Sequence, residues 1–420
     1  MLKLRVMFII RKAGQILLGI WGSPLLVILI CTLLSTACGV FFEPSNPTDA
    51  FEIPAVSKSP TATISPTASN TPTATSTFTP TFTPTQTSTP TPLLYVLEST
   101  PIPDYLTVIN PANAQSVSGL AEWQVPAVTD MSFSPDGSIL AVTDGEKIYL
   151  FDVFTREVIR TLYPEYLGII DIEFSPEGDW LVSGSRQGSQ ESGFRSRLEL
   201  WYGMDYKPVG LLYGDANSLS SMAFSPGGER LFTAYASPLY QANYIDFWDV
   251  STWTQTGLLQ TGTVLQIGVS GDGTLMASTP GRYSIRVWNF EDSIWLPTIH
   301  TSFTGAVNKT AFSPIELKLA TGHYDGLIAI WDMQTGALLF ELGSDGVIES
   351  LAFSPDGRLL ASGNSFENGE ISIWDAQSGV LLRELEGHQK GVSNLAFSPD
   401  GRLIISASYD GTLRSWGIRP

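Results

Sequence analysis

A five-residue motif occurs seven times in this 420-residue chain, and it constrains the fold more than any other feature. Successive copies begin 41, 50, 45, 43, 41 and 44 residues apart. The copies are FSPDG at Phe133, FSPEG at Phe174, FSPGG at Phe224, VSGDG at Val269, FSPIE at Phe312, and FSPDG at Phe353 and Phe397. The aromatic residues that follow them in short apolar runs are Phe151, Trp201, Trp248, Trp288, Trp331, Trp374 and Trp416. A period of roughly 40–45 residues with this ending predicts one four-stranded antiparallel blade per repeat.

The last repeat shows why each unit forms such a blade. Pro399, Asp400 and Gly401 have the conformational preferences of a tight turn. Residues 403–407 then read as one β-strand and residues 412–416 as the next, with Asp-Gly between them. One such sheet cannot bury both of its faces, whereas blades stacked around an axis can. The sequence therefore predicts an all-β, seven-bladed propeller.

The spacing of the repeats also predicts how the ring closes. Each next motif begins 21 to 24 positions after the closing aromatic residue, which leaves room for an outer strand and the next inner strand. Only four residues follow Trp416, so the last blade lacks an outer strand of its own. We expect the segment from Gln115 to Leu120 to supply it and to hold the two ends of the ring together.

This pattern resembles the WD-repeat family of β-propellers, and the resemblance covers about residues 104–420. The Trp-Asp pair stands at Trp248-Asp249, Trp331-Asp332 and Trp374-Asp375, and it drifts in the other repeats. The resemblance implies a non-enzymatic scaffold that presents loops to a protein or peptide partner and needs no cofactor. Fold alone does not give function, so these remain expectations.

The resemblance also implies a buried polar tetrad in each blade, made of a His from a Gly-His pair, a strand Ser or Thr, a turn Asp and the Trp. Only the last blade carries a full set, with His388, Ser406 (or Ser408), Asp410 and Trp416. His323 falls in a second strand, which does not match the family position. A catalytic role for His388 with Asp410 is the alternative, and the structural role is favoured because the family positions are structural.

The N-terminal segment 1–38 is an export or anchoring signal. Four basic residues (Lys3, Arg5, Arg11 and Lys12) precede a charge-free stretch from Ala13 to Phe42. The sequence around Ala37-Cys38 resembles a bacterial lipoprotein processing site, which implies lipid attachment at Cys38. An uncleaved membrane helix is the alternative, because the stretch is longer than the ~20 residues that span a bilayer. Both readings place the rest of the chain on the extracytoplasmic side of the cell membrane.

A stalk, residues 39–103, joins this signal to the propeller at 104–420. Within it, 27 of the 36 residues from Ser57 to Pro92 are Thr, Pro or Ser, which cannot form a hydrophobic core. The stalk is expected to be an extended spacer, and O-glycosylation of its threonines is a further reading. Both cysteines, Cys31 and Cys38, lie before it, so the propeller has neither a disulfide nor a cysteine metal site.

The net charge of the chain and the insertions in two of its blades narrow the kinds of partner that it can bind. The chain carries a net charge of −18, which disfavours nucleic acids and anionic membrane surfaces, and a basic partner or calcium is the charged alternative. Blades 2 and 3 have the longest insertions between their second and third strands, on the face where such loops commonly bind. The residues predicted to edge a protein, peptide or glycan site there are Arg186, Arg195, Arg197, Tyr240 and Tyr244.

Two further readings of function stay open. A propeller-based enzyme (a hydrolase, lyase or quinone-dependent dehydrogenase) is disfavoured by only three histidines and by the lack of HExxH, GxSxG, CxxC or a phosphate-binding glycine loop. A sensor would have to signal through a partner. Asp171 and Glu173 fall at period two on a strand, as on any polar face. Without a long exposed sheet edge, a monomer is expected.

Overall fold

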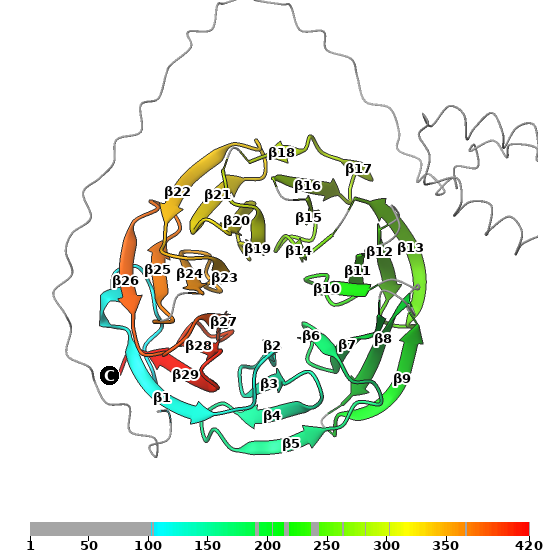
Figure 1. Ribbon diagram of the computed structural model, residues 1–420, viewed down its shortest axis with the longest axis horizontal. Coiled ribbons are helices and arrows are strands. Elements are labelled where there is room, and N and C mark those ends of the chain that lie inside the picture. Colours follow the sequence, from blue (N-terminus) through cyan, green and yellow to red (C-terminus); the bar gives the residue numbers. More distant parts are fainter. Residues whose placement is uncertain are drawn as a thin grey trace, which may run out of the picture. The chain divides into compact units, whose positions relative to one another are not determined.

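Seven β-sheets, six of four strands and one of five, stand in a ring around one axis in the computed structural model of the chain (Figure 1). The structure describes residues 102, 105–189, 193–203, 205–213, 218–236, 243–262, 264–281, 283–301, 303–365 and 368–419. Within these residues the strands form seven sheets, and all of them belong to the unit Thr87–Pro420. The predicted all-β, seven-bladed propeller is confirmed.

Each blade is a meander whose strands follow one another from the axis to the rim. Blades 1 and 2 contain β2 (Asp130–Phe133), β3 (Ile139–Thr143), β4 (Ile148–Asp152), β5 (Val158–Leu162), β6 (Ile169–Phe174), β7 (Trp180–Ser189), β8 (Gly193–Tyr202) and β9 (Lys207–Tyr213). Blades 3 and 4 contain β10 (Ser218–Phe224), β11 (Arg230–Ala236), β12 (Asn243–Asp249), β13 (Thr254–Thr261), β14 (Ile267–Val269), β15 (Leu275–Gly281), β16 (Ser284–Asn289), β17 (Ile294–Trp295) and β18 (Ile299–His300). Blades 5 to 7 contain β19 (Val307–Phe312), β20 (Lys318–His323), β21 (Leu327–Asp332), β22 (Leu338–Gly343), β23 (Ile348–Phe353), β24 (Leu359–Asn364), β25 (Ile371–Asp375), β26 (Leu381–Leu385), β27 (Val392–Phe397), β28 (Leu403–Ser408) and β29 (Thr412–Gly417).

The repeated motif forms the turn between the first two strands of a blade. In blade 1, Ser134 Oγ donates to Asp136 Oδ1 at 2.6 Å and accepts the backbone N–H of Ile139 at 2.9 Å. Gly137 takes φ of 72°, where a side chain would be strained, and a Cβ there would lie 3.3 Å from Pro399 of blade 7. The motif therefore makes its own turn and also packs it against the neighbouring blade.

The hydrophobic core lies between neighbouring sheets rather than inside any one of them. Ile148 and Leu150 of blade 1, for example, pack with Ile172 and Phe174 of blade 2, and each is at most 5% exposed. Burying one such side chain contributes about 1.5–3 kcal/mol. Because each blade buries its faces only against its neighbours, the ring must close before the terminal blades are stable.

The ring closes through β1 (Ser118–Gln124), which pairs with β29 as the outer strand of blade 7. Glu122 of this strand lies opposite Arg414 and forms an ion pair with it. The predicted N-terminal closing strand is confirmed, but its bounds differ from Gln115–Leu120. The short 3-10 helix η1 (Ala114–Ser116) occupies the start of that segment, after a turn in which Asn113 Oδ1 accepts the Asn110 amide at 2.7 Å.

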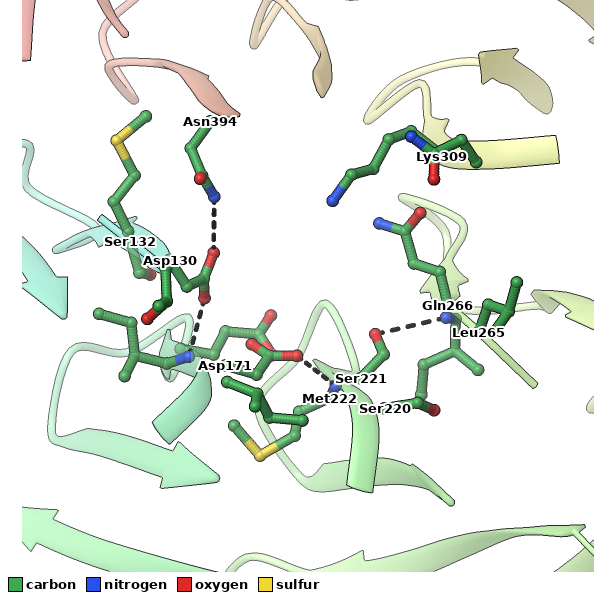
Figure 2. Close-up of a pocket in the computed structure, with 17 residues that line it drawn as sticks. Asp130, Ser132, Asp171, Ser220, Ser221, Met222, Leu265, Gln266, Lys309 and Asn394 are labelled. Carbon is green, nitrogen blue, oxygen red and sulfur yellow. Dashed lines mark hydrogen bonds between the residues drawn. The ribbon is translucent and has the colours of Figure 1, made fainter. Parts of the chain in front are cut away.

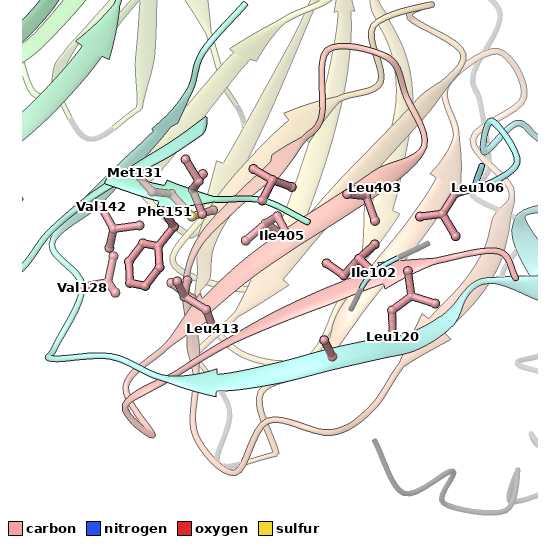
Figure 3. Packing of buried hydrophobic residues seen from close by; sticks show 14 residues of the cluster. Ile102, Leu106, Leu120, Val128, Met131, Val142, Phe151, Leu403, Ile405 and Leu413 are labelled. Atoms are coloured by element: carbon pink, nitrogen blue, oxygen red, sulfur yellow. The ribbon is translucent and has the colours of Figure 1, made fainter. Parts of the chain in front are cut away.

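Residues before β1 pack under blades 7 and 1, at the end of the blades that carries the motif turns. Ile102 and Leu106 are buried in the same cluster as Leu120 and Leu413 (Figure 3). The amide of Ile102 donates to Phe154 O at 3.1 Å, and Phe154 follows the third strand of blade 1. The described chain thus enters the propeller at the end opposite the turns between second and third strands.

Blade 4 departs from the predicted four strands. Its rim is made of two short pieces, β17 and β18, which both pair with β16. Pro297 lies between them and has no N–H to donate to the ladder, so one continuous outer strand cannot form.

Candidate functional site

The inner strands carry a ring of side chains that ties each blade to the next around the central axis. Most of these residues stand three places before the repeated motif. Asp130 Oδ2 accepts the Ile172 amide at 2.8 Å, and Asp171 Oδ2 accepts the Met222 amide at 2.7 Å. The remaining bonds are Ile267 N to Ser221 Oγ, Thr310 N to Gln266 Oε1, Asn308 Nδ2 to Ile348 O, Ser350 Oγ to Val392 O, and Asn394 Nδ2 to Asp130 Oδ1. All seven blade interfaces are therefore joined at the axis.

Blade 5 breaks this rule at one position. Lys309 stands three residues before the motif, where an ammonium cannot accept the neighbouring backbone N–H. Asn308 makes the inter-blade bond in its place, from Nδ2 to Ile348 O at 2.8 Å. Within the described part of the chain, the Lys309 side chain forms no hydrogen bond or close ion pair.

The wall formed by blades 1 and 2 is acidic. Burial raises the pKa of Asp130 to about 6 and that of Glu173 to about 8. Burial and the charges of these two neighbours raise the pKa of Asp171 well above its ordinary value. Glu173 Oε1 accepts the Phe224 amide at 3.4 Å, whereas Oε2 is buried and has no hydrogen-bond partner among the described residues. This wall therefore holds protons at neutral pH that an exposed carboxylate would release.

These groups face a cavity of about 360 Å³ on the axis, with Asp130 and Asp171 on one side and Lys309 on the other (Figure 2). Hydroxyl and amide groups from further blades complete the lining, among them Ser221, Gln266 and Asn394. A cavity of this size, with polar groups converging from several elements, falls in the usual range of small-molecule sites.

The sequence contains a clearer signal for this cavity than the strand period of two. Asp171 and Glu173 are two residues apart, which places them on one face of a strand, but the polar residues of any strand face show the same spacing. The offset from the motif was the better signal, because it selects Asp130, Asp171 and Lys309 at the same place in three different repeats.

The insertion of blade 2 is a long β-hairpin rather than a loop. β7 and β8 are each ten residues long, and their pairing continues to Ser189 opposite Gly193. Arg186 lies opposite Ser196, and Arg197 lies opposite Ser185. Strand pairing therefore holds this insertion in a defined register as it extends beyond the rest of the blade.

The five predicted binding-face residues are placed as follows. Arg186 donates from Nη1 to Ser218 Oγ of blade 3 at 3.3 Å, and the Arg197 guanidinium lies 5.6 Å from the centre of the Tyr166 ring. Tyr244 lies in β12, half-buried and opposite Tyr235. Arg195 lies in β8, but its side chain is outside the described part, as is the whole of Tyr240. The structure thus links Arg186 to the neighbouring blade and does not test binding by any of the five.

The tetrad residues of blade 7 lie within hydrogen-bonding distance of one another. His388 Nδ1 is 3.0 Å from Asp410 Oδ2, and its Nε2 is 2.8 Å from Ser406 Oγ. Trp416 Nε1–H donates to the same Oγ at 2.8 Å. Burial would raise the pKa of Asp410, but hydrogen bonds from His388, Thr412 and the Gln389 amide outweigh it and hold that pKa well below its ordinary value. With His388 only 2% exposed, this network is enclosed by protein.

His323 performs a similar task from an unexpected position. Its Nε2 lies 3.0 Å from Thr321 Oγ1, which also accepts the Trp331 Nε1–H at 3.0 Å. Its Nδ1 lies 3.1 Å from Gly305 O. The expectation that a second-strand position does not suit this role was wrong, because Phe303 packs against the imidazole, 4.8 Å between ring centres, where blade 7 has its Gly-His pair.

The described residues show neither a metal site nor a membrane-spanning helix. Among them, no three His, Cys, Asp or Glu side chains are grouped so that they could hold a metal ion. No helix within the described ranges is long and apolar enough to span a bilayer. Cys38, the predicted signal 1–38 and almost all of the stalk 39–103 lie outside the described residues.

Comparisons with known proteins agree with the repeat pattern. The family model described as WD domain, G-beta repeat matches residues 156–189, 296–332, 336–375 and 379–417. Nuclear distribution protein PAC1 of Arthroderma otae is 26% identical over 265 residues, 56% of this chain and 56% of that protein. Anaphase-promoting complex subunit cdc20 of Dictyostelium discoideum is 25% identical over 289 residues, 67% of this chain and 55% of that protein. Apoptotic protease-activating factor 1 of Homo sapiens is 33% identical over 114 residues, 25% of this chain and 9% of that protein. The matched part spans about half the length of the first two relatives.

Proposed function

The chain is a seven-bladed WD-repeat propeller, and from that premise we propose that it is a non-enzymatic scaffold which binds a protein or peptide partner. The observation that carries the proposal is the long hairpin β7–β8, which extends one end of blade 2 beyond its neighbours. Similar proteins include a subunit of the anaphase-promoting complex, which is by its name part of an assembly. A glycan partner at the same hairpin is an outcome that the experiment below distinguishes.

The hairpin suits binding because strand pairing fixes the backbone of its two arms as far as Ser189 and Gly193. Arg186 bonds to blade 3 and Arg197 stacks on Tyr166, so these two cations are held in place before any partner arrives. Pre-ordered side chains lose less conformational entropy on binding than those of a disordered loop. Arginine and tyrosine are also the residues most often found at the energetic centre of an interface.

The experiment is proximity labelling and pull-down from intact cells with a shortened hairpin. Replacing residues 187–195 by Asn-Gly joins Arg186 to Ser196, which are opposite each other, through a two-residue turn. We expect the wild-type chain to capture a partner that this variant loses. The variant keeps the part of β7 and β8 that belongs to the blade itself. Its melting temperature should therefore equal that of the wild type, and this serves as the folding control.

Two outcomes would speak against this placement. If the shortened variant captures the same partner, residues 187–195 of the hairpin are not the binding surface; if the variant with alanine at Arg186 and Arg197 captures it as well, the hairpin as a whole is not. If neither chain captures a protein, while a glycan array binds the wild type and not the shortened variant, then the partner is a glycan. Alanine at Arg186 and Arg197 together, with Arg160 on the rim of blade 1 as a control substitution, tests the two charges separately from the fold.

We also propose that the propeller is tethered to the extracytoplasmic side of the cell membrane through a lipid on Cys38. The support is the N-terminal sequence pattern, together with the entry of the chain at Ile102, at the end of the blades opposite β7–β8. A tether at that end leaves the hairpin free for a partner. Incorporation of labelled palmitate that Cys38→Ser abolishes is expected, and retention of an uncleaved N-terminus in the mature protein would instead indicate a membrane helix.

A further inference from the structure

The cavity on the axis is lined by two ionisable side chains that each have an atom without a hydrogen-bond partner among the described residues, the ammonium of Lys309 and Oε2 of Glu173. Every other blade interface takes its bond from the residue three places before the motif, and only blade 5 replaces that residue with a lysine and moves the bond to Asn308. The Lys309 ammonium therefore makes no hydrogen bond or close ion pair among the described residues, and it lies toward the open cavity in Figure 2. Its charge acts on the acidic wall only at longer range, where it lowers the pKa of Asp130 against the larger effect of burial. Local rules are usually broken in this way where a residue has another task.

The second unused group is on the opposite wall. Glu173 lines the same cavity, and its Oε2 has no hydrogen-bond partner among the described residues although it is shielded from bulk water. By contrast, both oxygens of Asp130 are occupied, by the Ile172 amide and by Asn394 Nδ2. A buried polar atom without a partner calls for an explanation such as a bound molecule.

We propose that this cavity binds a small zwitterion, with the carboxylate of the ligand at Lys309 and its ammonium group at Glu173. The two groups belong to blades 5 and 2 and do not pair with each other. Glu173 is protonated in the free protein near neutral pH, because burial raises its pKa, so binding of the ammonium displaces that proton to solvent. One ligand that carries both charges then satisfies both groups. A ligand with only a positive charge would be repelled by Lys309, and a ligand with only a negative charge would be repelled by the acidic wall. The volume of about 360 Å³ fits a molecule of this size.

The hydroxyl and amide groups between the two charges have a role in the same site. Ser221 and Gln266 accept backbone N–H groups of the next blade, so their positions are fixed before a ligand enters. Figure 2 shows them between the acidic wall and Lys309. Such pre-positioned groups select ligands by length and polarity more than by apolar area.

The test is isothermal titration of the full chain with ω-amino acids of increasing length: glycine, β-alanine, 4-aminobutyrate and 6-aminohexanoate. Butylamine and butyrate are the matched probes that carry one charge each. We expect at least one amino acid to bind with Kd below about 1 mM, with neither single-charge probe binding. The length that binds best measures the spacing between the two charged groups.

Substitutions then assign the two ends. Lys309→Met and Glu173→Gln should each weaken binding at least tenfold, whereas the exposed Lys390→Met should leave it unchanged. The proposal is overturned if no amino acid binds, if butylamine binds as well as the best amino acid, or if Lys309→Met binds normally. Binding should persist when the β7–β8 hairpin is shortened, so this result and the scaffold result can fail independently.

Discussion

The acidic wall of the cavity makes a sharp prediction for the pH dependence of stability. The pKa of Glu173 rises from 4.5 to about 8 in the folded state, so between these values the folded chain binds a proton that the unfolded chain releases. Stability therefore falls as pH increases through this window. Integrating the linkage relation from pH 5 to pH 8 gives a loss of about 3 kcal/mol from this one group, an upper value because neighbouring carboxyls titrate with it.

Glu173→Gln removes the titration while keeping the shape of the side chain and an oxygen for the Phe224 amide. At pH 5 the variant should be within about 1 kcal/mol of the wild type, because the carboxyl is then protonated in the folded wild type and close to its pKa of 4.5 in the unfolded chain. At pH 8 it should be more stable by up to about 3 kcal/mol, which is several degrees in Tm for a domain of this size. Glu177→Gln, an exposed carboxyl in the turn after the same strand, is the control and should change neither value.

The assay is thermal and urea unfolding of the wild type and both variants at pH 5 and pH 8. The difference between wild type and Glu173→Gln, rather than either absolute value, isolates this carboxyl from all other titrating groups. Equal loss of stability in the two proteins between pH 5 and pH 8 would refute the reasoning. It would mean that water reaches the carboxyl and keeps its pKa near the ordinary value.

Three other predictions concern the closure and interior of the ring. A chain beginning at Trp123 should be insoluble or melt far below one beginning at Asp104, because it lacks most of β1; equal melting temperatures would show that the strand is dispensable. Glu122→Lys should lower the free energy of unfolding by about 1–2 kcal/mol, because the ion pair to Arg414 is lost and the two positive charges repel each other across the strands. Exchanging the two charges, with Glu122→Lys and Arg414→Glu combined, should restore much of that free energy in a urea melt. Asp410→Asn should cost about 1–3 kcal/mol in the same measurement by weakening a buried network, and no change would show that the network is not needed.

Local sequence predicted the turns because the residues that make them are neighbours in the chain. Ser134, Asp136 and Gly137 bond and bend within one pentapeptide, so a pattern of letters is enough to predict that turn. The closing strand was predicted from spacing alone, and its bounds were displaced by the 3-10 helix at Ala114–Ser116. The spacing of the repeats shows only how many residues are available for a strand. The register of the strand depends on which of its side chains fit the surface beneath it.

The polar interior was harder to predict for the same reason. His323 was misjudged because its role depends on residues outside its own strand: Phe303 packs against its ring, and Gly305 O lies 3.1 Å from its Nδ1. The insertion in blade 2 was read as a loop, but β7 and β8 continue pairing through it. In both cases the deciding partner lies in a different segment of the chain, which local sequence patterns do not include.

The sequence by itself determined the number of blades, the turns and the need for a closing strand, because each of these follows from a repeated local pattern. Only the tertiary structure decided which side chains meet on the axis. Glu173 and Lys309 belong to different repeats, and closure of the ring is what brings them to the walls of one cavity. The burial that raises the pKa of Glu173 likewise exists only when all blades are in place. Each repeat specifies its own blade, but the chemistry of the cavity depends on side chains from several blades of the closed ring.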